Sequence, residues 1–349
     1  MEILILFKRH AIIRGVDRRE AVDAPRGHYF IISGRGESIL EMRLLVTGAA
    51  GFIGHHLCRL LLSRGYEVWG LDNLSRGDPA RIGALERMGM RFIKADIRNP
   101  EDVRSAIREA KPEAIAHLAA LISVSESVEK PDLYRAVNAV GTRNLVSAAN
   151  SFDVHRIVYA SSAAVYGNPA YLPIDEEHPT NPLSPYGETK LEGERCVLEE
   201  FRGDGRGIAL RLFNVYGLGQ NPEYAGVITR FMERLSAGEP PVIFGDGEQT
   251  RDFVYVADVA EAFLRALTCD SAEPQVFNIG SGKSVKVIDL ARLMISLFEL
   301  DLEPVHADPR PGDIRHSCAD ISRARKVLGW RPRTSLESGL RELLSELRG

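Results

Sequence analysis

One stretch decides the fold of this chain: Arg43-Leu44-Leu45-Val46-Thr47-Gly48-Ala49-Ala50-Gly51-Phe52-Ile53-Gly54. An apolar run ends at the first of three glycines, Gly48, Gly51 and Gly54, and an apolar pattern with helical spacing follows. In such a turn one glycine lets the backbone bend, a second lets a pyrophosphate approach the helix N-terminus, and a third allows close helix–strand packing. The stretch therefore predicts a strand, a phosphate-binding turn and a helix.

Short apolar runs alternate with helical patterns along the following residues. Strands are expected at Arg43–Thr47, Glu67–Asp72, Met90–Lys94, Ala114–Leu118, Arg156–Ala160 and Gly207–Leu212. Helices are expected at Gly51–Arg64, Pro131–Asn150 and Tyr186–Phe201. Alternation of this kind predicts an α/β fold in which a doubly wound, Rossmann-type parallel sheet is covered on both faces.

The pattern changes after about Asn214. Helices are expected at Gly226–Ala237, Val256–Leu267 and Val285–Phe298, with short strands at Val242–Phe244, Phe253–Tyr255 and Val276–Ile279. We therefore expect a cofactor-binding domain at 42–213 and a smaller mixed α/β substrate part at 214–349, with segments that return to the sheet. Ligands should bind between them, at the carboxyl ends of the strands.

Residues 1–41 differ from the rest of the chain. Their apolar run, Ile3–Phe7, is too short for a signal-peptide core, and the basic residues follow it. We hypothesise that Met42 is the natural start and that 1–41 is an extension or a misassigned start. The alternative is a genuine disordered or strand-adding arm, and N-terminal sequencing of the native protein separates the two.

Composition limits the function classes. The net charge of −4 over 349 residues argues against a nucleic-acid binder, which would usually show a basic face. An apolar run long enough to span a membrane is lacking. The four cysteines, Cys58, Cys196, Cys269 and Cys318, are scattered, and the histidines lack metal-ligand spacing. These features predict a cytoplasmic protein without a metal site.

Asp72 suggests which dinucleotide binds. It ends the second expected strand, where a carboxylate accepts hydrogen bonds from the adenosine ribose hydroxyls and repels a 2′-phosphate. NAD is therefore favoured over NADP, although the nearby Arg76 leaves NADP open. Asn73 follows the carboxylate, and Asp96 and Ile97 are placed to border the adenine. The alternative is a glycine-rich turn that binds no ligand.

Tyr186-Gly187-Glu188-Thr189-Lys190 supplies the chemistry. A free tyrosine has a pKa of about 10. Lys190 lies one helical turn after Tyr186, so its charge is expected to stabilise the phenolate and lower the tyrosine pKa. Ser162, upstream, can hold a substrate hydroxyl while Tyr186 exchanges a proton with it. Together with a bound dinucleotide, these residues predict alcohol–ketone redox chemistry.

From Met42 to its C-terminus, the chain resembles the extended short-chain dehydrogenase/reductase family. Within that family it is most similar to the NAD-dependent nucleotide-sugar epimerases that act on UDP-glucose or UDP-N-acetylglucosamine. The resemblance rests on these motifs, in this order: Gly48–Gly54, Asp72-Asn73-Leu74, Asp96-Ile97-Arg98, His117-Leu118-Ala119-Ala120, Ser161–Gly167, Pro185–Lys190, Arg211–Gly217, Arg251-Asp252-Phe253-Val254 and Arg310-Pro311-Gly312-Asp313.

The resemblance implies a role for each matching residue. Ser162, Tyr186 and Lys190 match the catalytic positions. Cofactor positions are matched by Gly48, Gly51, Phe52, Ile53, Gly54, Asp72, Asn73, Leu74, Ser75, Arg76, Gly77, Asp96, Ile97, Leu118, Ala119, Ala120, Asn138, Ser161, Phe213 and, in addition to their catalytic role, Tyr186 and Lys190. Substrate positions are matched by Ser123, Ser162, Asn214, Val227, Phe244, Arg251, Arg310, Asp313 and Ser317. Two guanidiniums suit a diphosphate, because arginine makes bidentate, charge-assisted bonds.

Three positions refine the implied reaction. Ala163 and Ala164 stand where related dehydratases carry an Asp-Glu pair, and where related decarboxylases carry a glutamate at the second position. Two methyl side chains supply no extra acid or base for elimination, so the resemblance implies oxidation and re-reduction only. Ile122 departs from epimerases that have a lysine there, which puts one contact to the nicotinamide ribose in doubt. Ser317, where the family varies between bulky and small, would leave room for a 2-N-acetyl group.

The resemblance therefore implies a UDP-sugar 4-epimerase that acts on UDP-glucose/UDP-galactose and UDP-GlcNAc/UDP-GalNAc. A homodimer through the helices near Pro131–Asn150 and Pro185–Phe201 is also implied. The alternatives are another nucleotide-sugar epimerase or a reductase, for example for a UDP-uronic acid or a dTDP-sugar, and a dinucleotide sensor without catalysis. A reductase would consume reduced cofactor stoichiometrically, and a sensor should have lost Tyr186 or Lys190.

Overall fold

The computed structural model describes residues 4–5, 29–33, 36–40, 42–220, 226–270, 275–309 and 314–348. Its centre is a seven-stranded sheet in the order β13-β9-β8-β7-β4-β5-β6, and all neighbouring strands are parallel. The strands are β4 (Arg43–Thr47), β5 (Glu67–Asp72), β6 (Arg91–Lys94), β7 (Ala114–His117), β8 (Arg156–Ser162), β9 (Gly207–Leu212) and β13 (Gln275–Ile279). The predicted Rossmann-type sheet is confirmed.

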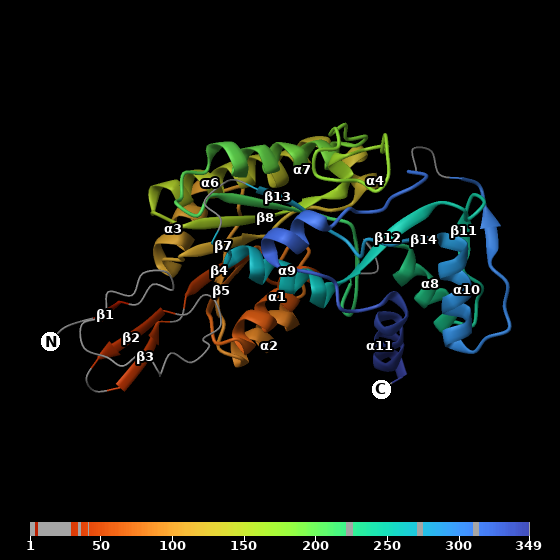
Figure 1. The fold of residues 1–349 in the computed structure, drawn as a ribbon, viewed down its shortest axis with the longest axis horizontal. Helices are drawn as coiled ribbons and strands as arrows, with labels where there is room; N and C mark the ends of the chain where they lie inside the picture. The colour runs from red at the N-terminus through yellow and green to blue at the C-terminus, as the bar shows by residue number, and fades with distance from the viewer. Residues whose placement is uncertain are drawn as a thin grey trace.

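Helices cover both faces of the sheet (Figure 1). One face carries α1 (Phe52–Ser63), α2 (Pro79–Arg87) and α9 (Val256–Leu267), and the other carries α3 (Pro100–Ala110), α6 (Gly141–Ser151) and α7 (Pro185–Arg195). Each layer has its own apolar core. Burial on both sides explains why β4 and β7 are almost continuously apolar rather than alternating.

The order of the strands places a crevice between β4 and β7. From β4 the chain passes to β5 and β6 at one edge, and it then returns to β7, which pairs with the opposite side of β4. The loops that follow β4 and β7 therefore diverge at the carboxyl ends of two adjacent strands, where doubly wound sheets bind ligands.

Helix α7, which carries the Tyr186–Lys190 motif, has a strong start. Ser184 is its N-cap, and the Ser184 side chain accepts a hydrogen bond from the Gly187 N–H at 3.2 Å. Pro185 occupies the first helical position, where its missing N–H costs nothing. These residues fix where the first turn of α7, and hence Tyr186, begins.

The single helix expected at 131–150 is built from three pieces. They are α5 (Pro131–Tyr134), a π-helical turn η1 (Arg135–Val140) and α6. Within η1 the Asn138 amide donates to the Leu121 carbonyl at 3.0 Å and accepts from the Leu121 N–H at 2.9 Å. The helix expected at 186–201 is similarly divided into α7 and the π-helical η3 (Cys196–Glu200).

Beyond the carboxyl end of β9, the chain forms a smaller group of elements. Its strands are β10 (Asn214–Tyr216), β12 (Thr250–Tyr255) and β14 (Ser284–Lys286) in one sheet, and β11 (Val242–Phe244) with β15 (Val305–Ala307) in another. Its helices are α8 (Val227–Ser236), α10 (Val287–Phe298) and α11 (Leu336–Arg348). They share a third apolar core and lie to one side of the large sheet in Figure 1.

Three short strands stand apart at the N-terminus. β1 (Leu4–Ile5), β2 (Tyr29–Ser33) and β3 (Gly36–Leu40) form an antiparallel sheet of their own. The rest of 1–41 lies outside the described residues, so whether Met42 is the natural start stays a hypothesis. In the part of the chain that the structure describes, the helices are all too short or too polar to cross a membrane.

Candidate active site

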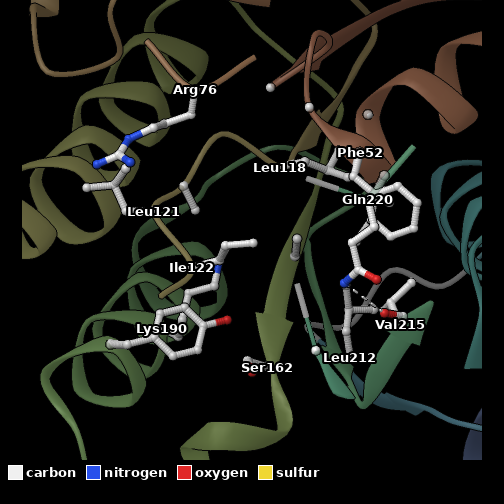
Figure 2. A pocket seen from close by; sticks show the side chains of 18 of the residues that line it. Phe52, Arg76, Leu118, Leu121, Ile122, Ser162, Lys190, Leu212, Val215 and Gln220 are labelled. Atoms are coloured by element: carbon white, nitrogen blue, oxygen red, sulfur yellow. Dashed lines mark hydrogen bonds between the residues drawn. The ribbon is translucent and has the colours of Figure 1, made fainter. Parts of the chain in front are cut away.

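A cavity of about 750 Å³ opens at the carboxyl ends of the parallel strands. Figure 2 shows Arg76, Leu121, Ile122 and Lys190 along one side of it and Phe52, Gln220, Val215 and Leu212 along the other, with Ser162 at the base. The first group comes from the loops and helices around β5, β7 and α7. The second group includes residues that follow β9, so both parts of the chain contribute walls.

Most of the residues predicted from sequence line this one cavity. They are Gly48, Gly51, Phe52, Ile53, Gly54, Asp72, Asn73, Ser75, Arg76, Gly77, Asp96, Ile97, Leu118, Ala119, Ala120, Ser161, Ser162, Tyr186, Lys190, Phe213, Asn214, Val227, Phe244 and Arg251. The structure therefore brings together candidate groups that lie more than 200 residues apart in sequence, from Gly48 to Arg251.

Six predicted residues are not among them. Leu74, Asn138, Ser123 and Ser317 do not contribute to the described lining of the cavity. Ser123 instead caps α4 (Val124–Glu129), where its side chain accepts from the Glu126 N–H at 3.1 Å. Ser317 is half-buried. Arg310 and Asp313 lie outside the described residues.

The glycine turn fits a phosphate. Gly48 has φ of +73°, and a Cβ on it would lie 2.8 Å from the Ala119 nitrogen, while a Cβ on Gly54 would lie 2.0 Å from the Gly48 oxygen. A side chain is therefore excluded at both positions. The N-cap of α1 is Gly51, and no side chain among the described residues caps the helix. Its first N–H groups point toward the cavity end of the helix, where the helix dipole favours an anion.

Asp72 is held rigidly at the end of β5. Its carboxylate accepts hydrogen bonds from the Leu74 N–H at 2.8 Å and from the Ala50 N–H at 3.1 Å. Burial raises the pKa of Asp72, and the two backbone donors act against that rise. The carboxylate therefore ties the turn after β5 to the glycine turn, and it faces the cavity where a ribose would bind.

Ser162, Tyr186 and Lys190 all line the cavity. Burial raises the pKa of Tyr186, and a hydrogen bond with Ser162 lowers it. Lys190 is only 3% exposed, and burial lowers the pKa of its ammonium to about 7. The net shift of the tyrosine pKa is upward, so our expectation that Lys190 sets a lowered value was wrong for this structure. The physical reason is the burial of the phenol itself, which disfavours the charged phenolate more than the hydrogen bond with Ser162 favours it.

The side chain of Ser161 is committed to a buried ion pair. It donates to Glu194 at 2.5 Å, and Glu194 also bonds the guanidinium of Arg211 through both carboxylate oxygens. The Arg211 guanidinium also donates a hydrogen bond to the Tyr166 hydroxyl at 3.0 Å. Ser161, Glu194 and Arg211 are all less than 7% exposed. This network links β8, α7 and β9, the three elements that carry catalytic candidates and the adjoining cavity wall.

Sequence reasoning missed several lining residues. Arg81 in α2 donates to the Ala50 carbonyl at 3.3 Å and to the Gly219 carbonyl, so it joins the glycine turn to the loop after β10. Glu126 in α4 pairs with Arg76 at 2.7 Å. Their helices, α2 and α4, were not predicted, although the Asp78-Pro79 and Ser123-x-x-Glu126 cap signals that begin them could have been recognised.

Ala163, Ala164 and Ile122, the positions that bear on which reaction is catalysed, all lie near the catalytic candidates or in the cavity wall. Ala163 and Ala164 form the short 3-10 turn η2 (Ala163–Val165) directly after Ser162, and the Ala164 N–H donates to the Ser162 Oγ at 3.2 Å. Both are half-buried methyl side chains next to the catalytic candidates. Ile122 lines the cavity and is 54% exposed.

Comparison with known proteins shows consistent relatives. The model of the NAD dependent epimerase/dehydratase family matches residues 44–280. The UDP-glucose 4-epimerase of Mycolicibacterium smegmatis is 43% identical over 306 residues, which cover 86% of this chain and 96% of that protein. The UDP-glucose 4-epimerase of Bacillus subtilis is 34% identical over 318 residues, which cover 85% and 94%.

Solved structures that are similar to this chain also include UDP-sugar 4-epimerases. A UDP-glucose 4-epimerase from Thermotoga maritima with UDP-glucose superposes with a TM-score of 0.81 at 36% identity, covering 88% of this chain and 99% of that one. The UDP-glucose 4-epimerase of Thermus thermophilus in complex with NAD gives 0.78 at 36% identity, with 88% and 99% covered. A UDP-N-acetylglucosamine 4-epimerase from Methanobrevibacter ruminantium, in complex with UDP-N-acetylmuramic acid, gives 0.82 at 34% identity, with 88% and 98% covered.

Proposed function

Because the chain belongs to the NAD-dependent epimerase/dehydratase family, we propose that it is an isomerase that inverts C4 of UDP-sugars through a transient 4-keto sugar. One observation carries the proposal. Ser162, Tyr186 and Lys190 line the same cavity as the glycine turn and Asp72, so a bound sugar hydroxyl and a bound dinucleotide would meet there. The relatives named above are UDP-sugar 4-epimerases, and the alignment with this chain covers nearly the whole length of each.

The glycine turn before α1 and the Asp72 carboxylate, which both line the cavity, fit NAD. The uncapped N-terminus of α1 suits the pyrophosphate, and the Asp72 carboxylate suits the adenosine ribose hydroxyls while repelling a 2′-phosphate. A cavity of about 750 Å³ has the size of a cofactor or ligand site. When bound, NAD would accept a hydride from C4 and later return it.

The chain's own residues would handle the proton. Tyr186 would take the C4 hydroxyl proton while the Ser162 hydroxyl holds the same oxygen in place. After the keto sugar turns about its diphosphate linkage, Tyr186 would deliver the proton to the oxygen on the opposite face. Ala163 and Ala164 add no acid or base for elimination, which supports simple inversion over dehydration.

The substrate would be anchored by its nucleotide. Asn214, Val227, Phe244 and Arg251 lie on the wall formed by the smaller part of the chain, and Arg251 supplies a guanidinium suited to a diphosphate. We propose that Arg310 and Asp313 complete this site. We also propose that Ser317 leaves room for an N-acetyl group, so that UDP-GlcNAc/UDP-GalNAc is accepted beside UDP-glucose/UDP-galactose.

The two parts of the chain would have separate binding roles, and the protein would form a homodimer. Residues 42–213 would bind NAD, and 214–349 would bind the nucleotide sugar. A homodimer would form through the helices around α6 and α7, where Val140 and Leu183 are exposed apolar side chains. The four cysteines are free, which supports a reducing compartment such as the cytoplasm. Light scattering coupled to size-exclusion chromatography tests the dimer.

The experiment is to incubate the purified protein with UDP-galactose and, separately, with UDP-GalNAc, without added reductant, and to follow the sugar by proton NMR. We expect the C4-inverted sugar with no net NADH. Tyr186→Phe keeps the ring and should lower the rate by about 10²–10⁴. Absence of turnover with NAD still bound would reject the UDP-sugars tested. In a second sample supplied with NADH, stoichiometric consumption of NADH would identify a reductase instead.

A further inference from the structure

The ammonium of Lys190 lies over an aromatic ring. Its Nζ is 4.8 Å from the centroid of the Tyr159 ring. Lys190 is 3% exposed, and within the described residues its ammonium makes neither a hydrogen bond nor an ion pair. The ring face is therefore the polar partner that the protein itself provides for this buried charge.

The ring of Tyr159 is firmly fixed. Tyr159 lies in β8, three residues before Ser162, and it is 1% exposed. The His117 ring packs beside it at 5.5 Å between centroids, and a Cβ on Gly193 would lie 2.5 Å from the Tyr159 hydroxyl. The hydroxyl lies near Thr142 but makes no hydrogen bond of normal geometry within the described residues. The ring face, rather than the hydroxyl, is thus the group that meets Lys190.

We propose that Tyr159 is a positioning residue: its ring face holds the ammonium of Lys190 beside Tyr186. This inference rests on the function proposed above, because it concerns the proton transfer assigned there to Tyr186. An aromatic face carries the negative part of the ring quadrupole and attracts a cation, more strongly where water is excluded. A rigid strand therefore fixes the location of a charge on a long, flexible side chain.

The need for such a partner follows from burial. Desolvation favours the neutral amine and lowers the pKa of Lys190 to about 7. Without the ring, the amine would be neutral over more of the physiological range, and it would be free to leave its place beside the phenol. Losing the ring should therefore change both the titration of Lys190 and the pH dependence of proton transfer.

Other titratable groups surround this site and must be distinguished from Tyr159. On the elements that pack around Lys190 they are His117 (β7), Tyr186 and Glu194 (α7), Glu126 (α4) and Tyr134 (α5). Burial and the Lys190 charge lower the pKa of His117 to about 3, so that imidazole stays neutral at working pH. Glu194 is paired with Arg211, and Glu126 with Arg76 and Lys130. None of these ion pairs includes Tyr159.

The test compares two substitutions at one position. Tyr159→Phe keeps the ring face and removes only the hydroxyl, whereas Tyr159→Leu removes the face and keeps an apolar side chain. Ile157→Val is the control for packing, because Ile157 is a buried residue two positions earlier on the same face of β8. Lysine labelled with ¹³C at Cε is incorporated, and the Lys190 signal is identified by its loss in Lys190→Met.

We expect Tyr159→Leu to reduce the charged fraction of Lys190 about tenfold at a pH above its pKa, and to move the corresponding limb of the kcat–pH profile with it. Tyr159→Phe should restore the titration and the profile of the unsubstituted protein, and Ile157→Val should leave both in place even if it lowers Tm. The inference is overturned if Lys190 titrates alike in Tyr159→Leu and Tyr159→Phe.

The two proposals fail in different ways. The NMR titration needs no substrate, so it tests the contact between Tyr159 and Lys190 directly. If the unsubstituted protein inverts no UDP-sugar, the proposed function fails even where the titration shifts. If it inverts the sugar and the titration does not shift, only the role of Tyr159 fails.

Discussion

Ser161 donates a 2.5 Å hydrogen bond to Glu194 and thereby joins the end of β8 to the helix that carries Tyr186 and Lys190. Glu194 lies two turns after Tyr186 on α7 and also binds Arg211 of β9. The contact therefore locks the strand that ends in Ser162 against the helix that presents the tyrosine.

Removing this carboxylate should be costly. We expect Glu194→Gln to lower the free energy of unfolding by about 3–5 kcal/mol, because it leaves the Arg211 charge buried without its partner. Ser161→Ala should cost about 1–2 kcal/mol. Urea unfolding measures both. Glu192→Gln is the control on the same helix, since its pairs with Arg135 and Arg143 are largely exposed and should change stability little. Equal losses for Glu192→Gln and Glu194→Gln would contradict the structural role.

Lys190 should destabilise the fold that it serves. Its pKa is about 7 in the folded chain and near the usual 10.5 when unfolded. Between these values the unfolded chain holds the extra proton, so the contribution of Lys190 to stability rises with pH across that window. We expect Lys190→Met to abolish activity and to stabilise the protein by up to about 5 kcal/mol below pH 7.

The stabilisation by Lys190→Met should shrink as the pH approaches 10.5. Thermal unfolding of both proteins at several pH values measures this. A gain that does not depend on pH would show that packing, and not the buried charge, accounts for the difference.

The Arg76–Glu126 pair should slow the loss of NAD. Arg76 follows β5, Glu126 belongs to α4, and both line the cavity, so their 2.7 Å contact joins two separate elements of its lining. We expect Arg76→Ala to speed NAD release about two- to fivefold, the effect of a partly exposed ion pair. Release is followed by the NAD that remains after gel filtration.

Reversal and exchange of the two charges sharpen this test. Arg76→Glu should release NAD faster than Arg76→Ala, and Arg76→Glu combined with Glu126→Arg should recover much of the retention. Lys130→Ala is the control, because Lys130 contacts the same carboxylate but does not line the cavity. If Lys130→Ala acts as strongly as Arg76→Ala, the contact between the Arg76 and Glu126 side chains is not the cause.

Ser317→Tyr should narrow the substrate range. If Ser317 borders the sugar, a phenol in its place would fill the space for a 2-N-acetyl group and reduce turnover of UDP-GalNAc at least tenfold relative to UDP-galactose. Competition assays with both sugars give the ratio. An unchanged ratio would remove Ser317 from the sugar pocket, in agreement with its absence from the described cavity wall.

The strongly apolar elements could be predicted from the sequence. The bounds of β4, β5, β9 and α9 match the expected ranges, because parallel strands and a buried helix require long apolar runs. Helices α2, α3, α4 and α11 were missed, since their surfaces are largely polar and only their caps mark them. In α3 the mark is Asn99 before Pro100.

The site could be predicted only as far as local motifs reach. The glycine turn and the Tyr186–Lys190 pair can be recognised in the sequence, because their function depends on a fixed spacing between nearby residues. Glu194, Arg211 and Tyr159 carry no such spacing, and their contacts exist only once β8, β9 and α7 are packed. The direction of the Tyr186 pKa shift was mistaken for the same reason, since burial is a property of the folded chain.

Strand β13 completes the edge of the sheet beside β9, although 62 residues separate Leu212 from Gln275. On the ribosome, the first six parallel strands can therefore associate while β9 still presents an open edge. A nascent chain halted before Gln275 would carry a nearly whole cofactor site next to a strand that can pair with another chain. Chaperone dependence should consequently peak late in translation and end when residues 275–279 emerge.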